Sequence, residues 1–185
     1  MIDRYVVFNY LDRVWYYGTM GRTAWLDSPS RQFPQAATLN NLVVFHEAAV
    51  DNGETNPPSP IYSYIQSSDF DIGDGHNYGF VHRMIPDITF DGSDMTGLST
   101  DKPQVRFITR PRQNPGANYG VSQSPAVTSA QSYAGQQTYN VQQFTEIVYT
   151  RIRGRQMSFR IESDTLGTQW QLGVPRLDVR PDGRK

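Results

Sequence analysis

The chain contains no cysteine among its 185 residues. This absence excludes disulfide bonds, thiolate zinc sites and cysteine nucleophiles. Long apolar runs are also missing, so no helix that spans a membrane is expected. Glycine and proline are frequent instead, at 15 and 12 residues, and both interrupt regular elements. We therefore expect no long helices.

Lysine is nearly absent as well, because Lys102 and Lys185 are the only two and arginine supplies the other basic residues. The planar guanidinium group of arginine forms paired hydrogen bonds and stacks on aromatic rings, which suits contact surfaces. The 17 basic and 18 acidic residues give a formal net charge of -1. This balance argues against a protein whose main role is to hold duplex DNA, because such proteins carry a basic excess.

Short segments rich in β-branched and aromatic residues, separated by turn residues, recur along the chain. They predict an all-β fold of short antiparallel strands that form a sandwich-like domain. Pro86 lies within one of these segments and is expected to make it an edge strand, a bulge or two shorter strands. The expected strands cover residues 5–10, 14–17, 40–47, 59–68, 79–90, 103–111, 149–161 and 169–179.

The organisation along the chain predicts two parts. Residues 1–28 are expected to form a hairpin with a turn at Leu11–Arg13, followed by a connection. Residues 29–185 are expected to form a β-rich domain, and the Ser-, Gln- and Gly-rich stretch at about 113–138 a flexible arm. Because the chain opens within a hairpin, we expect it to belong to a longer parent protein.

One acidic turn resembles a calcium-binding loop. Asp69, Asp71 and Asp74 precede Gly75, and hard cations favour carboxylate oxygens around a tight turn. The EF-hand spacing fails, however, since Phe80 stands where the bidentate glutamate is required. Aspartates that cap their own turn are the favoured interpretation, so these residues are weak metal candidates and we predict no metal site.

Catalytic motifs are also missing. His46 and Glu47 begin like the zinc-protease pattern, but Val50 occupies the place of the second histidine. Neither a serine-nucleophile elbow nor a phosphate-binding glycine loop is present. We therefore predict no catalytic residues, no cofactor and no enzyme activity.

The segment YTRIRGRQMSFRIESD is the main candidate for a functional surface. Strand alternation places Arg151, Arg153 and Arg155 on one face, and the apolar residues change parity after Gly154 as they would at a β-bulge. Arg160 follows in the second half of the segment. These arginines can face carboxylates of a protein partner, phosphates or solvent, and the near-zero net charge favours a protein partner.

Several segments in order along the chain resemble one family. They are YVVFNYLDRVWYYGTMGRTAWLD, HEAAVD, IQSSDFDIGDGHNYGFVHRMIPDITF, RPRQNPGANYG and the closing segment from Tyr149 to Lys185. Together they are similar to the C-terminal portion of the tail hub or nozzle proteins of short-tailed bacteriophages, also called packaged-DNA stabilisation or tail tubular proteins. Members of that family are several times longer than 185 residues.

The resemblance implies a virion structural protein of the phage tail, assembled in the cytoplasm of the host bacterium. Such a protein forms a ring with copies of itself, extends the DNA exit channel, helps to retain packaged DNA and allows genomic DNA to pass. Its other partners are the portal or adaptor proteins, the tail needle and the fibres. The resemblance places Trp15, Arg22 and Trp25 near the end of an incomplete β-propeller, and Trp170 with the arginines in the closing segment.

A carbohydrate-binding β-sandwich module or a depolymerase fragment is the alternative, since both are aromatic-rich and need no cysteine. Paired carboxylates for glycoside hydrolysis need only spatial proximity, so no sequence motif identifies them. Sugar binding or sugar release would separate this alternative from the structural role.

Overall fold

The computed structural model describes residues 3–27, 32–71, 75–96, 102–112 and 136–183. Every regular element in these ranges is a β-strand, and all strand pairs are antiparallel, which confirms the predicted all-β fold. The strands form two compact units, Met1–Ser59 and Pro60–Lys185. Within the described ranges, no helix has the length and apolar character needed to cross a membrane.

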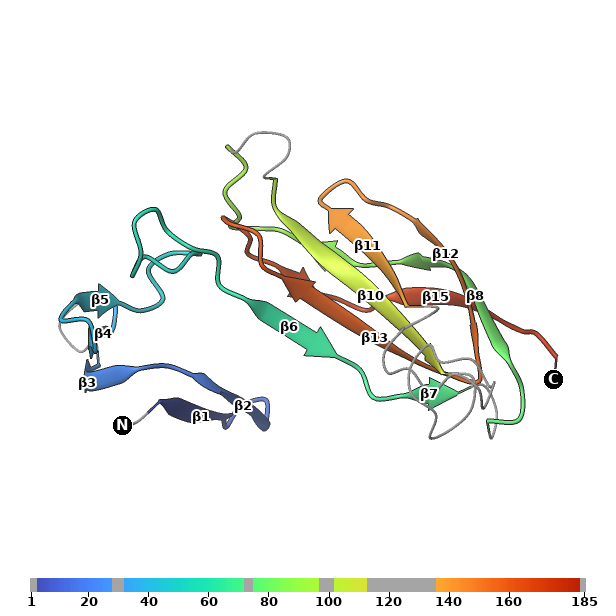
Figure 1. Ribbon diagram of the computed structural model, residues 1–185, viewed down its shortest axis with the longest axis horizontal. Coiled ribbons are helices and arrows are strands. Elements are labelled where there is room, and N and C mark those ends of the chain that lie inside the picture. The colour runs from blue at the N-terminus through green and yellow to red at the C-terminus, as the bar shows by residue number, and fades with distance from the viewer. Residues whose placement is uncertain (1–2, 28–31, 72–74, 97–101, 113–135, 184–185) are drawn as a thin grey trace, which may run out of the picture. The chain divides into compact units, whose positions relative to one another are not determined.

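The first unit opens with the expected hairpin (Figure 1). Strands β1 (Arg4–Asn9) and β2 (Val14–Thr19) pair along their whole length. In the turn, the Asn9 side-chain oxygen accepts hydrogen bonds from the backbone amides of Leu11 and Asp12. The sequence predicted this turn because its signals are local.

Three further strands complete the first unit as a separate sheet. They are β3 (Arg22–Leu26), β4 (Gln35–Thr38) and β5 (Val43–Phe45), in the order β3-β4-β5. The division between units therefore falls after Ser59, whereas the sequence suggested a boundary at residue 28. Strand pairing explains the difference, since β3 lies before residue 28 and its partner β4 after it.

The second unit holds two larger sheets and a two-stranded ribbon, β14-β9. The first sheet has the order β11-β10-β13-β6, with β7 also paired to β13, and the second has the order β12-β8-β15. The strands are β6 (Ser63–Gln66), β7 (Phe70–Asp71), β8 (Gly79–Ile85), β9 (Ile88–Thr89), β10 (Gln104–Arg112), β11 (Gln137–Gln142), β12 (Val148–Gly154), β13 (Gln156–Ser163), β14 (Gln171–Leu172) and β15 (Arg176–Pro181).

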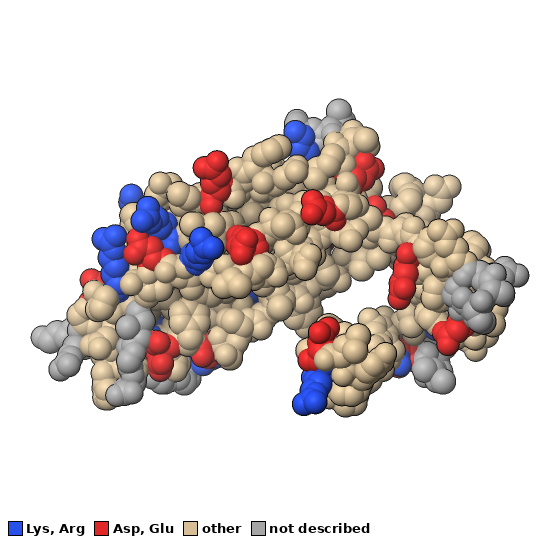
Figure 2. All heavy atoms as spheres, turned by 180° about the vertical axis from the view of Figure 1, so that it is seen from behind, with Lys and Arg blue, Asp and Glu red and all other residues tan. Residues whose placement is uncertain are grey.

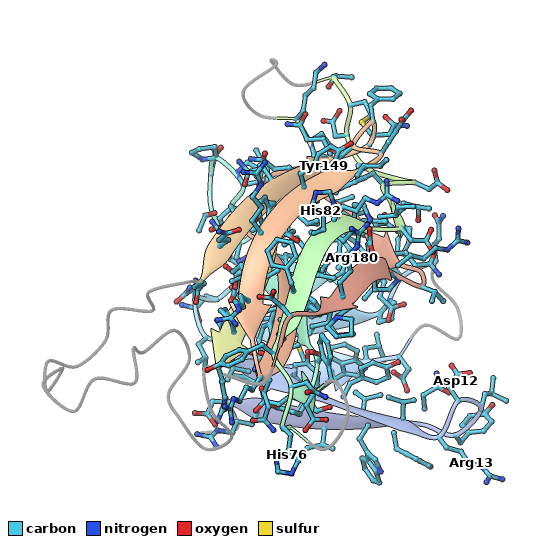
Figure 3. All side chains as sticks on the ribbon, turned by 90° about the vertical axis from the view of Figure 1, so that its right-hand side faces the viewer. Asp12, Arg13, His76, His82, Tyr149 and Arg180 are labelled. Atoms are coloured by element: carbon cyan, nitrogen blue, oxygen red, sulfur yellow. The ribbon has the colours of Figure 1, made fainter. Side chains whose placement is uncertain are left out.

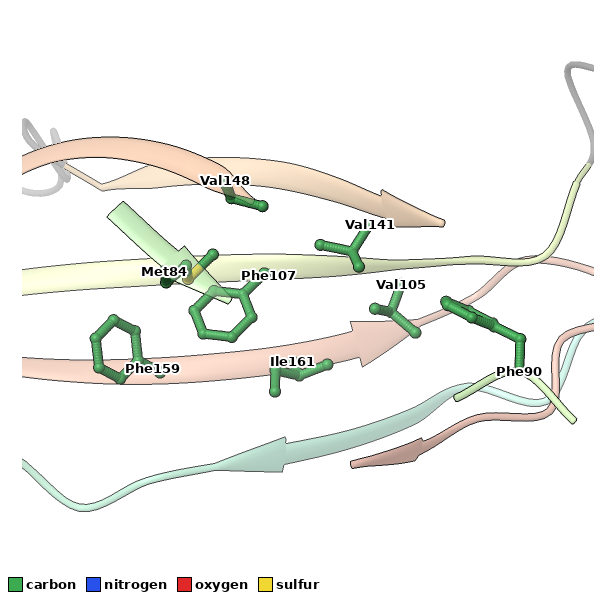
Figure 4. Close-up of a cluster of buried hydrophobic side chains, with 8 residues drawn as sticks. All are labelled: Met84, Phe90, Val105, Phe107, Val141, Val148, Phe159 and Ile161. Atoms are coloured by element: carbon green, nitrogen blue, oxygen red, sulfur yellow. The ribbon is translucent and has the colours of Figure 1, made fainter. Parts of the chain in front are cut away.

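A shared hydrophobic core joins the two sheets of the second unit into a sandwich (Figure 4). Val105, Phe107 and Ile161 come from the first sheet, whereas Met84 and Val148 come from the second. Burial of such side chains is the main driving force for folding in this unit. The predicted sandwich-like architecture therefore applies to residues 60–185, and the expected propeller remains a prediction.

The structure specifies the outcome at Pro86 and at the end of the expected arm. Pro86 separates β8 from β9, so its segment forms two shorter strands as one of the predicted outcomes. The expected flexible arm falls largely on residues 113–135, which lie outside the described residues. Its last residues belong to β11, which begins at Gln137 and pairs with β10.

The arginine segment differs from the expected bulged strand. It forms two strands, β12 and β13, which belong to different sheets and meet at a bend at Arg155. The irregular register lies earlier, between Tyr149 and Ile152, where β12 pairs with β8. The change of parity after Gly154 therefore marks a crossing from one sheet to the other, and such corners are common in sandwiches.

Candidate interaction surface

The exposed side of the sheet β12-β8-β15 carries two of the four arginines expected to be functional, Arg151 and Arg153. Alternation along β12 buries Val148, Thr150 and Ile152 and exposes Tyr149, Arg151 and Arg153, as the sequence predicted. We call this surface the arginine–aromatic face. Its members are Phe80, His82, Arg83, Tyr149, Arg151, Arg153, Arg176 and Arg180.

Strand register interleaves aromatic side chains with the arginines on this face. Phe80 of β8 lies between Arg153 of β12 and Arg180 of β15. The His82 ring lies 6.3 Å from the Phe80 ring and 6.1 Å from the Tyr149 ring, measured between centroids. Figure 3 shows His82, Tyr149 and Arg180 on the same side of the three strands.

Sequence reasoning missed this interleaving. Of these aromatic residues only Tyr149 belongs to the arginine segment, whereas Phe80 and His82 come from β8, which is distant in sequence. The only local signal was the polar and aromatic alternation of Phe80, His82 and Arg83. Cross-strand neighbours of this kind are set by pairing, and single-segment patterns do not reveal them.

Carboxylates offset part of the positive charge of the face, and Figure 2 shows acidic side chains next to basic ones. Asp178 pairs with Arg83 at 3.2 Å and with Arg180 at 3.3 Å, and Asp182 pairs with Arg153. The hydrogen bond from Arg180 is the main reason that the pKa of Asp178 is lowered, and the charges of both arginines add to it. Five arginines against two carboxylates leave this face with a positive balance.

Arg153 and Arg155 both lie against the ring of Tyr78, which is 4% exposed. The guanidinium carbon of Arg153 lies 4.1 Å from the ring centroid and that of Arg155 lies 4.9 Å from it. Cation–π contacts hold such side chains in fixed positions. Arg155 follows the bend and does not extend the row formed by Arg151 and Arg153.

Arg151 and Arg176 differ from the other arginines of the face. Both are exposed, and neither guanidinium forms a hydrogen bond or ion pair with the described part of the chain. An exposed guanidinium without such a partner keeps its hydrogen-bonding capacity for another molecule. Among the described residues of the arginine–aromatic face, these two guanidinium groups are therefore the ones open to a binding partner.

Arg160 lies on the other large sheet. Its guanidinium donates to Glu162 at 2.8 Å and to Gln66 at 3.2 Å, and it stacks 4.0 Å from the Tyr64 ring centroid. Partial burial alone would raise the pKa of Glu162. Hydrogen bonds from Arg160 and Tyr62 and the charges of nearby arginines outweigh that effect, so the pKa is lowered.

The three tryptophans occupy different settings. Trp15, on β2, is 65% exposed, and its ring lies 4.6 Å from that of Phe8. Trp25, on β3, lies 4.5 Å from the His46 ring. Trp170 packs against the core of the second unit and donates to the Ser63 hydroxyl at 2.9 Å. Trp170 is therefore structural, and Trp15 is available to a partner.

The acidic turn contributes an ion pair within the chain. Asp69 lies 3.1 Å from Arg112, and Asp71 belongs to β7, where it pairs with Gln156. Asp74 lies outside the described residues. No group of three metal-ligating side chains comes together among the residues that the structure describes.

No protein-family model matches this chain, and no curated protein matches it either.

Proposed function

We propose that this chain is a structural part of a multi-subunit assembly, specifically the C-terminal portion of a tail hub or nozzle protein of a short-tailed bacteriophage. In this role it contacts copies of itself in a ring and docks portal, adaptor, needle or fibre proteins in the virion tail. Passage of genomic DNA follows from the same role. The family assignment rests on the sequence motifs, and the assembly role rests on the surfaces described above.

The arginine–aromatic face is the observation that carries the proposal. Interfaces between proteins are enriched in arginine and aromatic residues, and their energetic centres combine both types. On this face Asp178 and Tyr78 already hold several arginines in place, which reduces the entropy lost on binding. Arg151 and Arg176 remain for carboxylates of a partner.

The N-terminal hairpin supports an assembly role independently. It exposes Val6, Phe8, Trp15 and Tyr17 among other apolar side chains on both of its faces. An isolated two-stranded hairpin is only marginally stable, and exposed apolar surface of this kind marks a contact region. A subunit of a larger structure would bury it against neighbouring residues.

The partner must supply its own acidic residues. Asp69 of the acidic turn already pairs with Arg112 within the chain. Subunits of a ring meet through two different patches, so the complementary patch lies elsewhere on the neighbour. Carboxylates are favoured over phosphates because the whole chain carries a formal charge of -1.

The test begins with an immunoblot of purified phage particles using antibody raised against this chain. A band well above 21.0 kDa would support a place at the end of a long virion protein. A band at 21.0 kDa would contradict the portion-of-a-hub proposal, and absence from particles would contradict the virion role altogether.

The arginine–aromatic face is tested by charge reversal at Arg151. The Arg151→Glu variant should stay folded, because the Arg151 side chain has no ion-pair partner among the described residues. It should fail to enter particles, because the reversed charge repels carboxylates of the partner. Lys102→Glu, an exposed reversal outside this face, is the matched control and should enter particles normally. Normal incorporation of folded Arg151→Glu would contradict this use of the face.

A further inference from the structure

The outer side of the other large sheet carries a second surface, which we call the tyrosine platform. It lies on β6, β13 and β10, and strand register brings its side chains together: Arg160 faces Gln66, and Ser158 faces Arg110. Its members are Tyr62, which directly precedes β6, and Tyr64, Gln66, Arg110 and Arg160, whereas Ser158 is buried.

We infer that the tyrosine platform binds a neutral carbohydrate chain. Tyr62 and Tyr64 are 52% and 51% exposed, and their ring centroids lie 5.8 Å apart with a tilt of 34°. Sugar rings present an apolar C–H face that packs on aromatic rings, with hydroxyl groups around its rim. Tyr64 lies on the edge strand β6 and Tyr62 directly precedes it, and the ring surface that Arg160 does not cover offers that packing to sugar units.

The rings are held in place before any ligand arrives. The Tyr62 hydroxyl donates to Glu162 at 2.8 Å and accepts a hydrogen bond from Arg160. The Arg160 guanidinium also stacks on Tyr64 at 4.0 Å. Side chains that are already ordered lose little entropy on binding, so their contacts contribute more to affinity.

Polar groups suited to hydroxyls lie beside the rings. The Gln66 side-chain oxygen accepts from Arg110 at 3.1 Å and from Arg160 at 3.2 Å, and the described residues provide no partner for the two N–H donors of its amide.

The charges around the platform are nearly balanced, with three arginines and two carboxylates. Arg106 and Arg160 are matched by Glu162 and Asp164, with contacts of 3.0 Å, 2.9 Å and 2.8 Å. Arg110 is the one guanidinium of this group for which the described residues provide no carboxylate partner. A neutral ligand with an apolar face and many hydroxyls fits this balance better than a polyphosphate, which requires a larger basic excess.

A peptide added to the free edge of β6 is the competing ligand, because edge strands accept extended segments through their backbone. Such binding depends on the backbone of Ser63 to Gln66 and only weakly on the planar shape of Tyr64. The carbohydrate proposal depends on that ring, which makes the two separable. The platform is independent of the arginine–aromatic face, so this proposal goes beyond the assembly role.

The experiment uses the full chain with ring-labelled tyrosine and follows the Tyr62 and Tyr64 signals by NMR. The probes are neutral oligosaccharides of glucose, galactose, mannose and N-acetylglucosamine at millimolar concentration. At least one should shift both signals saturably. Tyr64→Ala should weaken its binding about tenfold or more, whereas Tyr64→Phe, which keeps the ring, should retain it.

Tyr149→Ala is the matched control, since it removes an exposed tyrosine from the sheet β12-β8-β15 and should leave sugar binding unchanged. If Tyr64→Ala fails to fold, the comparison of Tyr64→Phe with Tyr64→Leu carries the test, because leucine is apolar but not planar. Absence of binding by every sugar, or binding unaffected by loss of the Tyr64 ring, would overturn the proposal. Neither result bears on incorporation into particles.

Discussion

The buried Gly154 packs directly against the backbone of Arg112. A Cβ atom at position 154 would lie 3.0 Å from the Arg112 carbonyl oxygen, and the same oxygen accepts a hydrogen bond from the Arg155 amide at 2.8 Å. The contact lies where the chain passes from β12 to β13 and joins the end of one sheet to the other. A side chain at position 154 would push these two segments apart.

We predict that Gly154→Ala lowers the free energy of unfolding by about 1–3 kcal/mol, because backbone atoms on both sides cannot move away cheaply. Urea denaturation followed by circular dichroism measures the change. Gly53→Ala is the control, since nothing lies within 4 Å of a Cβ atom there, and its effect should stay within about 0.5 kcal/mol. Equal effects of the two substitutions would contradict the packing argument.

Arg151 and Arg153 should separate binding from stability. Arg153→Ala removes the stacking on Tyr78 and the ion pair with Asp182, and should cost about 1–2 kcal/mol of stability. Arg151→Ala removes no ion pair or side-chain hydrogen bond to the described residues and should change stability by less than about 0.5 kcal/mol. Thermal unfolding of both variants measures the difference. A larger loss of stability for Arg151→Ala than for Arg153→Ala would contradict this prediction.

The Glu162 carboxylate should make the second unit sensitive to acid. Its pKa is lowered below the ordinary value of 4.5, so the unfolded chain takes up a proton at higher pH than the folded protein does. This contribution is complete above the unfolded pKa and is lost as pH falls through the folded pKa. Melting temperatures measured from about pH 6 to about pH 3 should fall less steeply for Glu162→Gln than for the wild-type chain. Parallel curves would contradict the proposed role of the carboxylate.

His46 should make the first unit weaken at mildly acidic pH. Burial and then the positive charge of Arg22, which donates to the ring at 3.0 Å, lower its pKa from 6.5. The unfolded chain therefore binds a proton at higher pH than the folded unit, so stability declines as pH falls below 6.5. NMR titration of the imidazole measures the pKa of His46. Urea unfolding followed by the NMR signal of Ala36 measures the stability of the first unit at each pH. The His46→Gln variant should lose the pH dependence over this range, and a titration at or above 6.5 would contradict the prediction.

Much of the local structure follows from short-range patterns. The β1–β2 hairpin was predicted from two apolar runs around Asp12, and the alternation of Val148, Thr150 and Ile152 predicted the buried side of β12. Both signals come from residues that are close together in the sequence, so they can be recognised without knowing which strands pair. The break at Pro86 belongs to the same class, because proline removes a backbone donor wherever the fold places it.

The arginine–aromatic face and the tyrosine platform could not be predicted from short-range patterns. The neighbours of Arg153 include Tyr78 and Phe80 from one segment and Asp182 from another, and both segments are distant from β12 in sequence. The tyrosine platform likewise depends on the pairing of β6 with β13. Pairing between distant strands is selected by burial of the whole core. A single sequence indicates which residues can be buried, but it does not show which strands pair with each other.

The sequence by itself therefore determined the all-β class, the hairpin and the side of β12 that carries arginines. Tertiary structure decided which arginines are free. Arg153 and Arg160 are held by Asp182 and Glu162, whereas Arg151 has no such partner among the described residues. The reason is physical: alternation along a strand sets the direction of a side chain, but only the packing of sheets sets which charges and rings it meets.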